Sequence, residues 1–252
     1  MFTPEERARM RTELLELAGR DARVSGTAIT GSHAAGREDR WSDIDLAFGV
    51  SDAAQVEAVF ADFTAVMYER YRALHHLDMT AGAWIYRVFF LPGTLQVDLA
   101  FVGSEEFRPL GATFQLVSGT AKPMQAMPAA DPKSIIGMAW LYALHARSCI
   151  VRGKSWQAEY IISAVRDHAL MLACVRMGLP SAYGRGMDQL SEAVKAQMAG
   201  ALVRSFEREE LWRAFRAAVR GLLSEARHAD AEFAARIEGE LRELCAEGGV
   251  AE

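Results

Sequence analysis

Apolar and polar residues alternate along several short segments of the first hundred residues, as they do in β-strands that bury one face. Other segments show the helical spacing of apolar residues, and Pro92-Gly93-Thr94 separates two of the strand-like segments as a turn would. The pattern predicts strands over 23–30, 43–50, 84–91 and 95–102, helices over 4–19 and 53–72, and a helical turn over 32–37. The first part of the chain is therefore predicted to be a β-sheet with flanking helices.

The second half of the chain has a different pattern. Proline and glycine recur between residues 103 and 132, which is typical of irregular backbone. Helical periodicity then continues almost to the end, over 134–151, 154–177, 187–200, 208–229 and 231–245. We therefore expect two domains, with residues 1–118 forming the sheet domain and residues 119–252 forming an all-α helical bundle.

Two aspartates stand on one face of a predicted strand. Asp43 and Asp45 alternate with Ile44 and Leu46, so the two carboxylates project together while the apolar side chains point the other way. Neighbouring carboxylates repel each other unless a cation lies between them. Hard oxygen ligands of this kind suit Mg²⁺, which binds carboxylates together with substrate phosphates. The pair therefore predicts a metal and a phosphate.

A third acid is found on the second strand of the predicted hairpin. Asp98 shares a face with Gln96 and Ala100, and its sequence neighbours Val97 and Leu99 are apolar. A carboxylate in such surroundings is costly unless it has a cation. We therefore expect Asp98 to be the third metal ligand.

These acids belong to a longer pattern with a glycine-serine dipeptide, a second glycine and a serine before the first acid. Its members are Gly31, Ser32, Gly36, Ser42, Asp43, Asp45 and Asp98. In this pattern, over about residues 20–105, the chain resembles the nucleotidyltransferase superfamily that includes DNA polymerase beta and the antibiotic nucleotidyltransferases. The resemblance implies an α+β fold in which a mixed β-sheet nucleotidyltransferase domain with flanking helices precedes the helical domain.

Phosphate chemistry suggests a role for each motif residue. Gly31 would permit a tight turn, and Ser32 would hold the β- and γ-phosphates of ATP or another nucleoside triphosphate. Gly36 would let the backbone pack close to a strand or ligand, and Ser42 would orient the loop before Asp43. With two Mg²⁺ ions at the aspartates, the expected reaction is attack of a hydroxyl on the α-phosphate with release of pyrophosphate.

The helical half offers two further candidates, because some antibiotic nucleotidyltransferases draw a lysine for the phosphates and a glutamate base from that domain. The predicted helix 154–177 begins near Lys154 and carries Glu159 on its polar face. We take Lys154 as the candidate phosphate ligand. The general base is either Asp98 or Glu159, and the sequence leaves both open.

The net charge and the length of the chain limit the classes of acceptor that we expect. The net charge is −5 and no run of basic residues is present, which argues against a nucleic-acid partner. The length and the helical domain resemble the lincosamide- and aminoglycoside-modifying enzymes, so we expect a small-molecule hydroxyl acceptor, for instance an antibiotic. Two alternatives stay open: nucleotidylation of a protein side chain, as in toxin-antitoxin members of the family, and a nucleotide-binding protein without turnover.

The cysteines, the first residues and the apolar stretches of the chain bear on the cellular location of the protein. The three cysteines Cys149, Cys174 and Cys245 are far apart, which indicates neither a metal site nor a disulfide framework. The chain opens on a helix start at Thr3-Pro4 rather than on a targeting segment, and the apolar stretch from Trp84 to Val102 is interrupted by charged residues. We therefore expect a cytoplasmic protein with no membrane partner, and the sequence does not indicate an oligomeric state.

Overall fold

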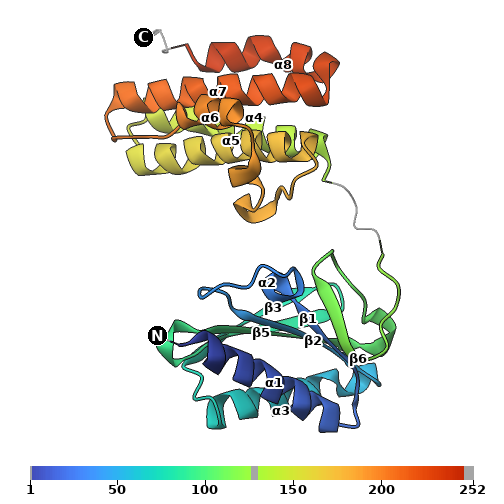
Figure 1. The fold of residues 1–252 in the computed structure, drawn as a ribbon. Helices are drawn as coiled ribbons and strands as arrows, with labels where there is room; N and C mark the ends of the chain where they lie inside the picture. Colours follow the sequence, from blue (N-terminus) through green and yellow to red (C-terminus); the bar gives the residue numbers. More distant parts are fainter. Residues whose placement is uncertain (1, 126–129, 247–252) are drawn as a thin grey trace. The chain divides into compact units, whose positions relative to one another are not determined.

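The computed structural model describes residues 2–125 and 130–246. The chain divides into two compact units, Met1–Pro128 and Ala129–Glu252 (Figure 1). The division falls after residue 128, whereas the sequence suggested a boundary after residue 118. Each unit has its own core, and each is described by itself.

The first unit is built on one mixed sheet of six strands, in the order β3-β4-β5-β2-β1-β6. Its strands are β1 (Val24–Thr30), β2 (Ile44–Val50), β3 (His75–Ala81), β4 (Trp84–Phe90), β5 (Gln96–Gly103) and β6 (Phe114–Gly119). Strands β2 and β5 run parallel, while the other neighbouring pairs are antiparallel. The predicted α+β class with a mixed sheet is therefore confirmed.

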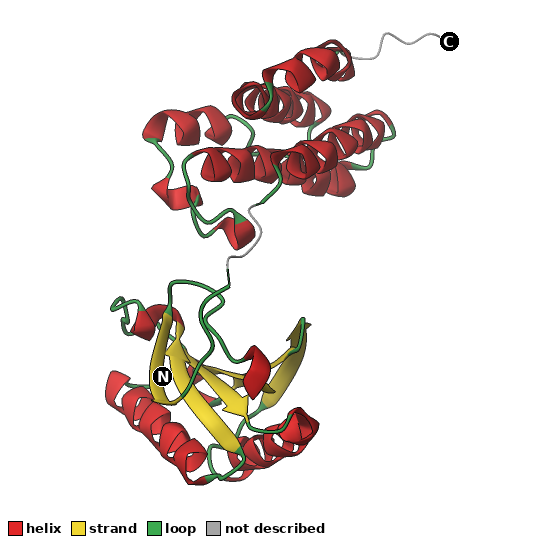
Figure 2. Ribbon diagram, turned by 90° about the vertical axis from the view of Figure 1, so that its right-hand side faces the viewer, coloured by secondary structure: helices red, strands yellow, loops and turns green. Residues whose placement is uncertain are grey.

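Two helices cover one face of this sheet, α1 (Pro4–Arg20) and α3 (Val56–Glu69) (Figure 2). Helix α1 begins with a capping box, in which Thr3 and Glu6 each bond to the other's backbone N–H. Leu14 from α1 and Phe63 from α3 join a core cluster with the inward residues of β2 and β5. That cluster uses the side chains that alternate with the aspartates, so the aspartates point to the opposite face.

The second unit contains only helices among its described residues. They are α4 (Pro132–Val151), α5 (Ser155–Arg176), α6 (Glu192–Ala199), α7 (Arg208–Ala229) and α8 (Ala231–Leu244), with two short 3₁₀ turns before α6. Small buried residues such as Ala143 on α4, Ala169 on α5 and Ala218 on α7 share its core. By length and composition α4 could cross a membrane, with a mean hydropathy of 1.3. Its fully buried residues, among them Ile136 and Ala143, instead pack in this core.

The sequence pattern missed two strands. Both β3 and β6 are edge strands of the sheet, and nearly all of their residues are exposed. A strand with little buried surface does not show the alternation of apolar and polar residues that identified the central strands. The predicted helix 187–200 also begins later, because residues Met187–Gln189 form a separate 3₁₀ turn before α6.

Candidate active site

Three carboxylates meet at the start of the parallel strand pair. Asp43 directly precedes β2, Asp45 lies on β2, and Asp98 lies on β5 opposite Asp45 in the strand register. One ligand oxygen from each of the three lies within 4.8 Å of the others. Because the two strands are parallel and in register, acids near both of their N-terminal ends are brought to the same edge of the sheet. The structure thus brings together all three acids that the sequence singled out.

Asp98 has a distinctive electrostatic environment. Burial raises the pKa of its carboxyl to about 6, a hydrogen bond from Gln96 works against this rise, and the charge of Asp43 adds to it. The Gln96 amide nitrogen Nε2 donates to Asp98 Oδ1 at 2.9 Å and lies 3.5 Å from Asp43 Oδ2. The raised pKa shows that a negative charge at Asp98 lacks compensation from the protein itself. A divalent cation would provide that compensation, so the donor set fits Mg²⁺.

The glycine-serine turn adjoins the triad. The chain leaves β1 through Gly31, which opens the short helix α2 (Gly31–Ala34) with φ of +64°. A Cβ atom at this position would lie only 1.8 Å from Asp45 Oδ2. Glycine is therefore required here both by the left-handed backbone and by the close approach to Asp45.

Ser32 follows directly on this turn. Its hydroxyl oxygen is buried and has no hydrogen-bond partner among the described residues. A buried hydroxyl without a partner is uncommon in folded proteins, because it loses its bonds to water and gains nothing in return. The position next to the triad makes Ser32 available to a ligand that carries hydrogen-bonding oxygens.

Gly36 and Ser42 occupy the connection between α2 and β2. The expected packing of Gly36 against a strand is not found, because a Cβ atom there would meet nothing within 4 Å. Its φ of +65° accounts for the glycine instead. Ser42 belongs to a tight turn with Asp39, in which its Oγ accepts from the Asp39 N–H at 2.9 Å.

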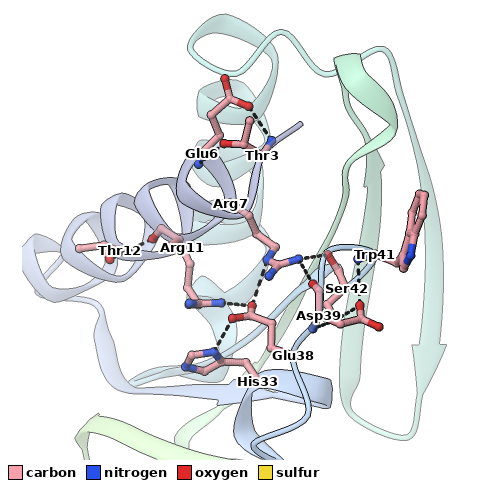
Figure 3. A network of polar contacts seen from close by, with 11 residues as sticks. Thr3, Glu6, Arg7, Arg11, Thr12, His33, Glu38, Asp39, Trp41 and Ser42 are labelled. Carbon is pink, nitrogen blue, oxygen red and sulfur yellow. Dashed lines mark hydrogen bonds and ion pairs between the residues drawn. The ribbon is translucent and has the colours of Figure 1, made fainter. Parts of the chain in front are cut away.

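A buried ionic network stands beside this connection (Figure 3). Glu38 contacts two guanidinium groups and one imidazole: Arg7 Nε at 3.0 Å, Arg11 Nη1, and His33 Nδ1 at 3.0 Å. These contacts hold the pKa of the Glu38 carboxyl below its usual range, although burial alone would raise it. The two arginines lie on α1, one turn apart, and both pair with Glu38 in the connection between α2 and β2.

Lys154 and Glu159 lie in the second unit. Lys154 is exposed and occupies the N-cap position of α5. Glu159 is partly buried and accepts a hydrogen bond from Ser163 Oγ at 2.9 Å. Arg166, on the same polar stripe, pairs with Asp167 at 2.8 Å. Both candidates remain predictions.

Sequence reasoning missed four residues around the site: Gln96, Glu38, Arg7 and Arg11. The signal for Gln96 was present, since strand alternation places it on the face of Asp98, two residues away. The arginines gave no signal, because an arginine on an amphipathic helix is ordinarily read as exposed. Arg7 is in fact only 3% exposed.

Comparison with known proteins gives distant similarities. No protein-family model matches the chain, and no significant match is found among curated proteins. Among solved structures, the chain is similar to an aminoglycoside 6-adenyltransferase from Bacillus subtilis, with 11% identity, 98% of this chain and 100% of that chain covered, and a TM-score of 0.42.

Two further structures are similar to the chain. A nucleotidyltransferase-like protein from Exiguobacterium sibiricum 255-15 shares 11% identity, with 92% of this chain and 80% of that chain covered and a TM-score of 0.39. The polymerase core of TRAMP, an RNA surveillance complex, shares 9% identity, with 98% and 85% covered and a TM-score of 0.30. All three similarities are distant, with identities of 9–11% and TM-scores of 0.30–0.42.

Proposed function

We propose that the chain is a Mg²⁺-dependent nucleotidyltransferase that transfers a nucleoside monophosphate from a nucleoside triphosphate to a hydroxyl group. The observation that carries this proposal is the convergence of Asp43, Asp45 and Asp98 within 4.8 Å, next to a glycine turn that touches Asp45. An acidic triad alone would indicate a cation site. The adjoining turn, with the unpartnered hydroxyl of Ser32, adds a place for phosphate oxygens.

The three aspartates would hold two Mg²⁺ ions, which when bound lower the pKa of the attacking hydroxyl and neutralise charge on the phosphates. Ser32 donates its hydroxyl hydrogen to a phosphate oxygen and thereby gains the partner it lacks. Gly31 and Gly36 let the backbone follow the left-handed turns that place Ser32 beside the triad. Ser42 holds the turn that leads to Asp43. Lys154 is the proposed second phosphate ligand.

The reaction exchanges one phosphorus–oxygen bond for another. The acceptor oxygen attacks the α-phosphorus, the bond from this phosphorus to the bridging oxygen breaks, and pyrophosphate leaves. The proton of the acceptor hydroxyl passes to a carboxylate base. Asp98 is the stronger candidate, because only Asp98 belongs to the motif that the chain shares with the nucleotidyltransferase superfamily. Glu159 is the alternative base.

We further propose ATP as the donor and a small hydroxylated molecule, such as an antibiotic, as the acceptor, with the reaction taking place in the cytoplasm. The basis for the acceptor is the sequence resemblance to the antibiotic nucleotidyltransferases, together with the helical second unit. The absence of a basic run in the sequence speaks against a nucleic-acid acceptor.

The decisive experiment measures pyrophosphate release with Mg²⁺, each nucleoside triphosphate in turn, and a panel of small hydroxylated acceptors. Asp43→Asn and Asp45→Asn should abolish release while circular dichroism stays native, because each removes one ligand from the triad. Asp62→Asn is the matched control, since it removes an exposed carboxylate that pairs with Arg23. Near wild-type turnover of Asp43→Asn or Asp45→Asn in saturating Mg²⁺ would refute the proposal. A mass increase of a co-expressed protein would point to the protein-side-chain alternative.

A further inference from the structure

The backbone reaches Asp43 through a tight turn at Asp39–Ser42. The Ser42 N–H donates to the Asp39 carbonyl at 3.2 Å, which closes the turn. Asp39 Oδ1 accepts from the Trp41 N–H at 2.8 Å and from Ser42 Oγ at 3.1 Å. The turn is thus held internally at several points. Its last residue precedes Asp43, so any displacement of the turn is passed on to this carboxylate.

Arg7 attaches the turn to helix α1. Its Nη1 donates to the Asp39 carbonyl at 2.6 Å and to the Ser42 carbonyl at 2.9 Å, so one guanidinium nitrogen binds both ends of the turn (Figure 3). The side chain is 3% exposed. A buried guanidinium with several partners has little freedom to move, because leaving any of them would strand a charge away from water.

Glu38 holds Arg7 in place and also contacts the glycine-serine turn region. Its Oε1 lies 3.0 Å from Arg7 Nε, and its Oε2 lies 3.0 Å from Nδ1 of His33, the residue after Ser32. One carboxylate therefore joins α1, the proposed phosphate turn and the loop to β2. Arg11 also pairs with Glu38, whereas the hydrogen bonds to the Asp39 and Ser42 carbonyls come from Arg7.

We propose that Arg7, oriented by Glu38, is a positioning residue that fixes the backbone entering Asp43 and so sets the geometry of the metal-binding triad. This inference rests on the proposed function. Asp43 lies at the end of a loop rather than within β2, so the strand ladder that aligns Asp45 with Asp98 does not fix it. The two hydrogen bonds from Arg7 to the Asp39 and Ser42 carbonyls instead hold the backbone that leads into Asp43.

The expected effect of Arg7 on metal affinity follows from groups that orient a metal ligand without binding the metal themselves. Partners that orient a ligand change metal affinity or activity by about 10- to 100-fold when removed. Arg7 acts one step further out, on the peptide carbonyl that precedes the ligand. Its guanidinium can serve Glu38 and both carbonyls at once because it is a planar group with five N–H donors. A lysine would retain the charge beside Glu38 but would lose this simultaneous contact.

The test compares Arg7→Met, Arg7→Lys and Arg11→Met with the wild type, using Mn²⁺ as the probe, followed by electron paramagnetic resonance. Arg11→Met is the matched control, because it removes the same charge from the same helix and the same carboxylate without touching the turn. Arg7→Met should weaken Mn²⁺ binding about 10- to 100-fold, Arg7→Lys should give a smaller loss, and Arg11→Met should bind close to wild type. In turnover, kcat of Arg7→Met should fall while KM for the triphosphate changes little.

The measured Mn²⁺ affinities distinguish a failure of positioning by Arg7 from a failure of the proposed function. Equal Mn²⁺ affinities of Arg7→Met and wild type, or equal losses in Arg7→Met and Arg11→Met, would overturn positioning by Arg7 and leave the proposed function intact. A wild type that binds no Mn²⁺ would refute both. If Arg7→Met does not fold, Arg7→Lys decides: Mn²⁺ affinity equal to the wild type overturns the inference, and a loss larger than that of Arg11→Met supports it.

Discussion

Replacing Asp98 by asparagine should stabilise the metal-free protein at neutral and alkaline pH. Burial raises the pKa of Asp98 from 3.8 to about 6. Each pKa unit corresponds to 1.36 kcal/mol between the two protonation states, so an ionised Asp98 costs about 3 kcal/mol when no metal is bound. Asparagine keeps nearly the same shape and carries no charge. We therefore expect Asp98→Asn to gain at most about 3 kcal/mol of unfolding free energy at pH 8.

The stability gained by Asp98→Asn should increase as pH rises. Between pH 3.8 and about 6 the folded protein retains a proton at Asp98 that the unfolded chain has released. The folded state then binds more protons, so the stability of the wild type falls as pH rises through this window. Below pH 3.8 both states are protonated and the difference from Asp98→Asn should vanish. Urea unfolding in metal-free buffer at pH 4, 6 and 8 measures this directly.

Two further measurements make the result specific to the metal site. Saturating Mg²⁺ should stabilise the wild type and stabilise Asp98→Asn much less, because a ligand that binds only the folded state adds RT ln(1 + [L]/Kd) of stability and the variant binds Mg²⁺ with a larger Kd. Asp78→Asn provides a contrast, since hydrogen bonds from Arg87 lower the pKa of Asp78 and its removal should destabilise the protein at pH 8. A stability difference between wild type and Asp98→Asn that stays constant from pH 4 to 8 would refute the reasoning.

Three more variants probe the proposed site. Gly31→Ala would place a Cβ atom 1.8 Å from Asp45 Oδ2 at a φ of +64°, so we expect Mg²⁺-dependent turnover to be lost even where the protein folds; activity equal to wild type would show that Asp45 moves without consequence. Ser32→Ala should weaken triphosphate binding by about 1–3 kcal/mol in calorimetry and leave acceptor affinity unchanged; an unaltered triphosphate affinity would assign Ser32 no phosphate contact. Glu159→Gln should turn over nearly as wild type if Asp98 is the base, whereas a loss of roughly 10²–10⁴-fold with intact nucleotide affinity would identify Glu159.

The central part of the fold was predictable because its sequence signal comes from burial. Strands β2 and β5 bury Leu46 and Leu99 on one face and carry Asp45 and Asp98 on the other, so alternation located both strands and both acids. The long helices were predictable for the same reason, and α7 spans the range 208–229 that its periodicity indicated. The order of the strands and the parallel pairing of β2 with β5 were not predicted from the pattern. They depend on contacts between distant segments.

Buried polar residues escaped prediction for a physical reason. Arg7 and Arg11 lie on a helix whose pattern suggests that charged residues face water. Their burial is made favourable by contacts more than twenty-five residues away, with Glu38 for both and with the Asp39 and Ser42 carbonyls for Arg7. The pattern of one segment contains no information about a partner in another. The sequence also does not show why Gly36 is a glycine, since a glycine required by φ and one required by close packing look identical in a sequence.

The register between β4 and β5 is a condition for the whole site. Side chains on a strand alternate between the two faces, so a slip of one residue would turn Asp98 toward the core and Val97 and Leu99 toward the triad. An ionised carboxyl in that core would be surrounded by apolar side chains and separated from the carboxylates of Asp43 and Asp45. The short connection at Pro92–Thr94 fixes the register, because β4 pairs with β5 directly across it and Gly93 takes the left-handed conformation it needs. The same apolar residues that build the core therefore determine on which face the third acid of the proposed metal site lies.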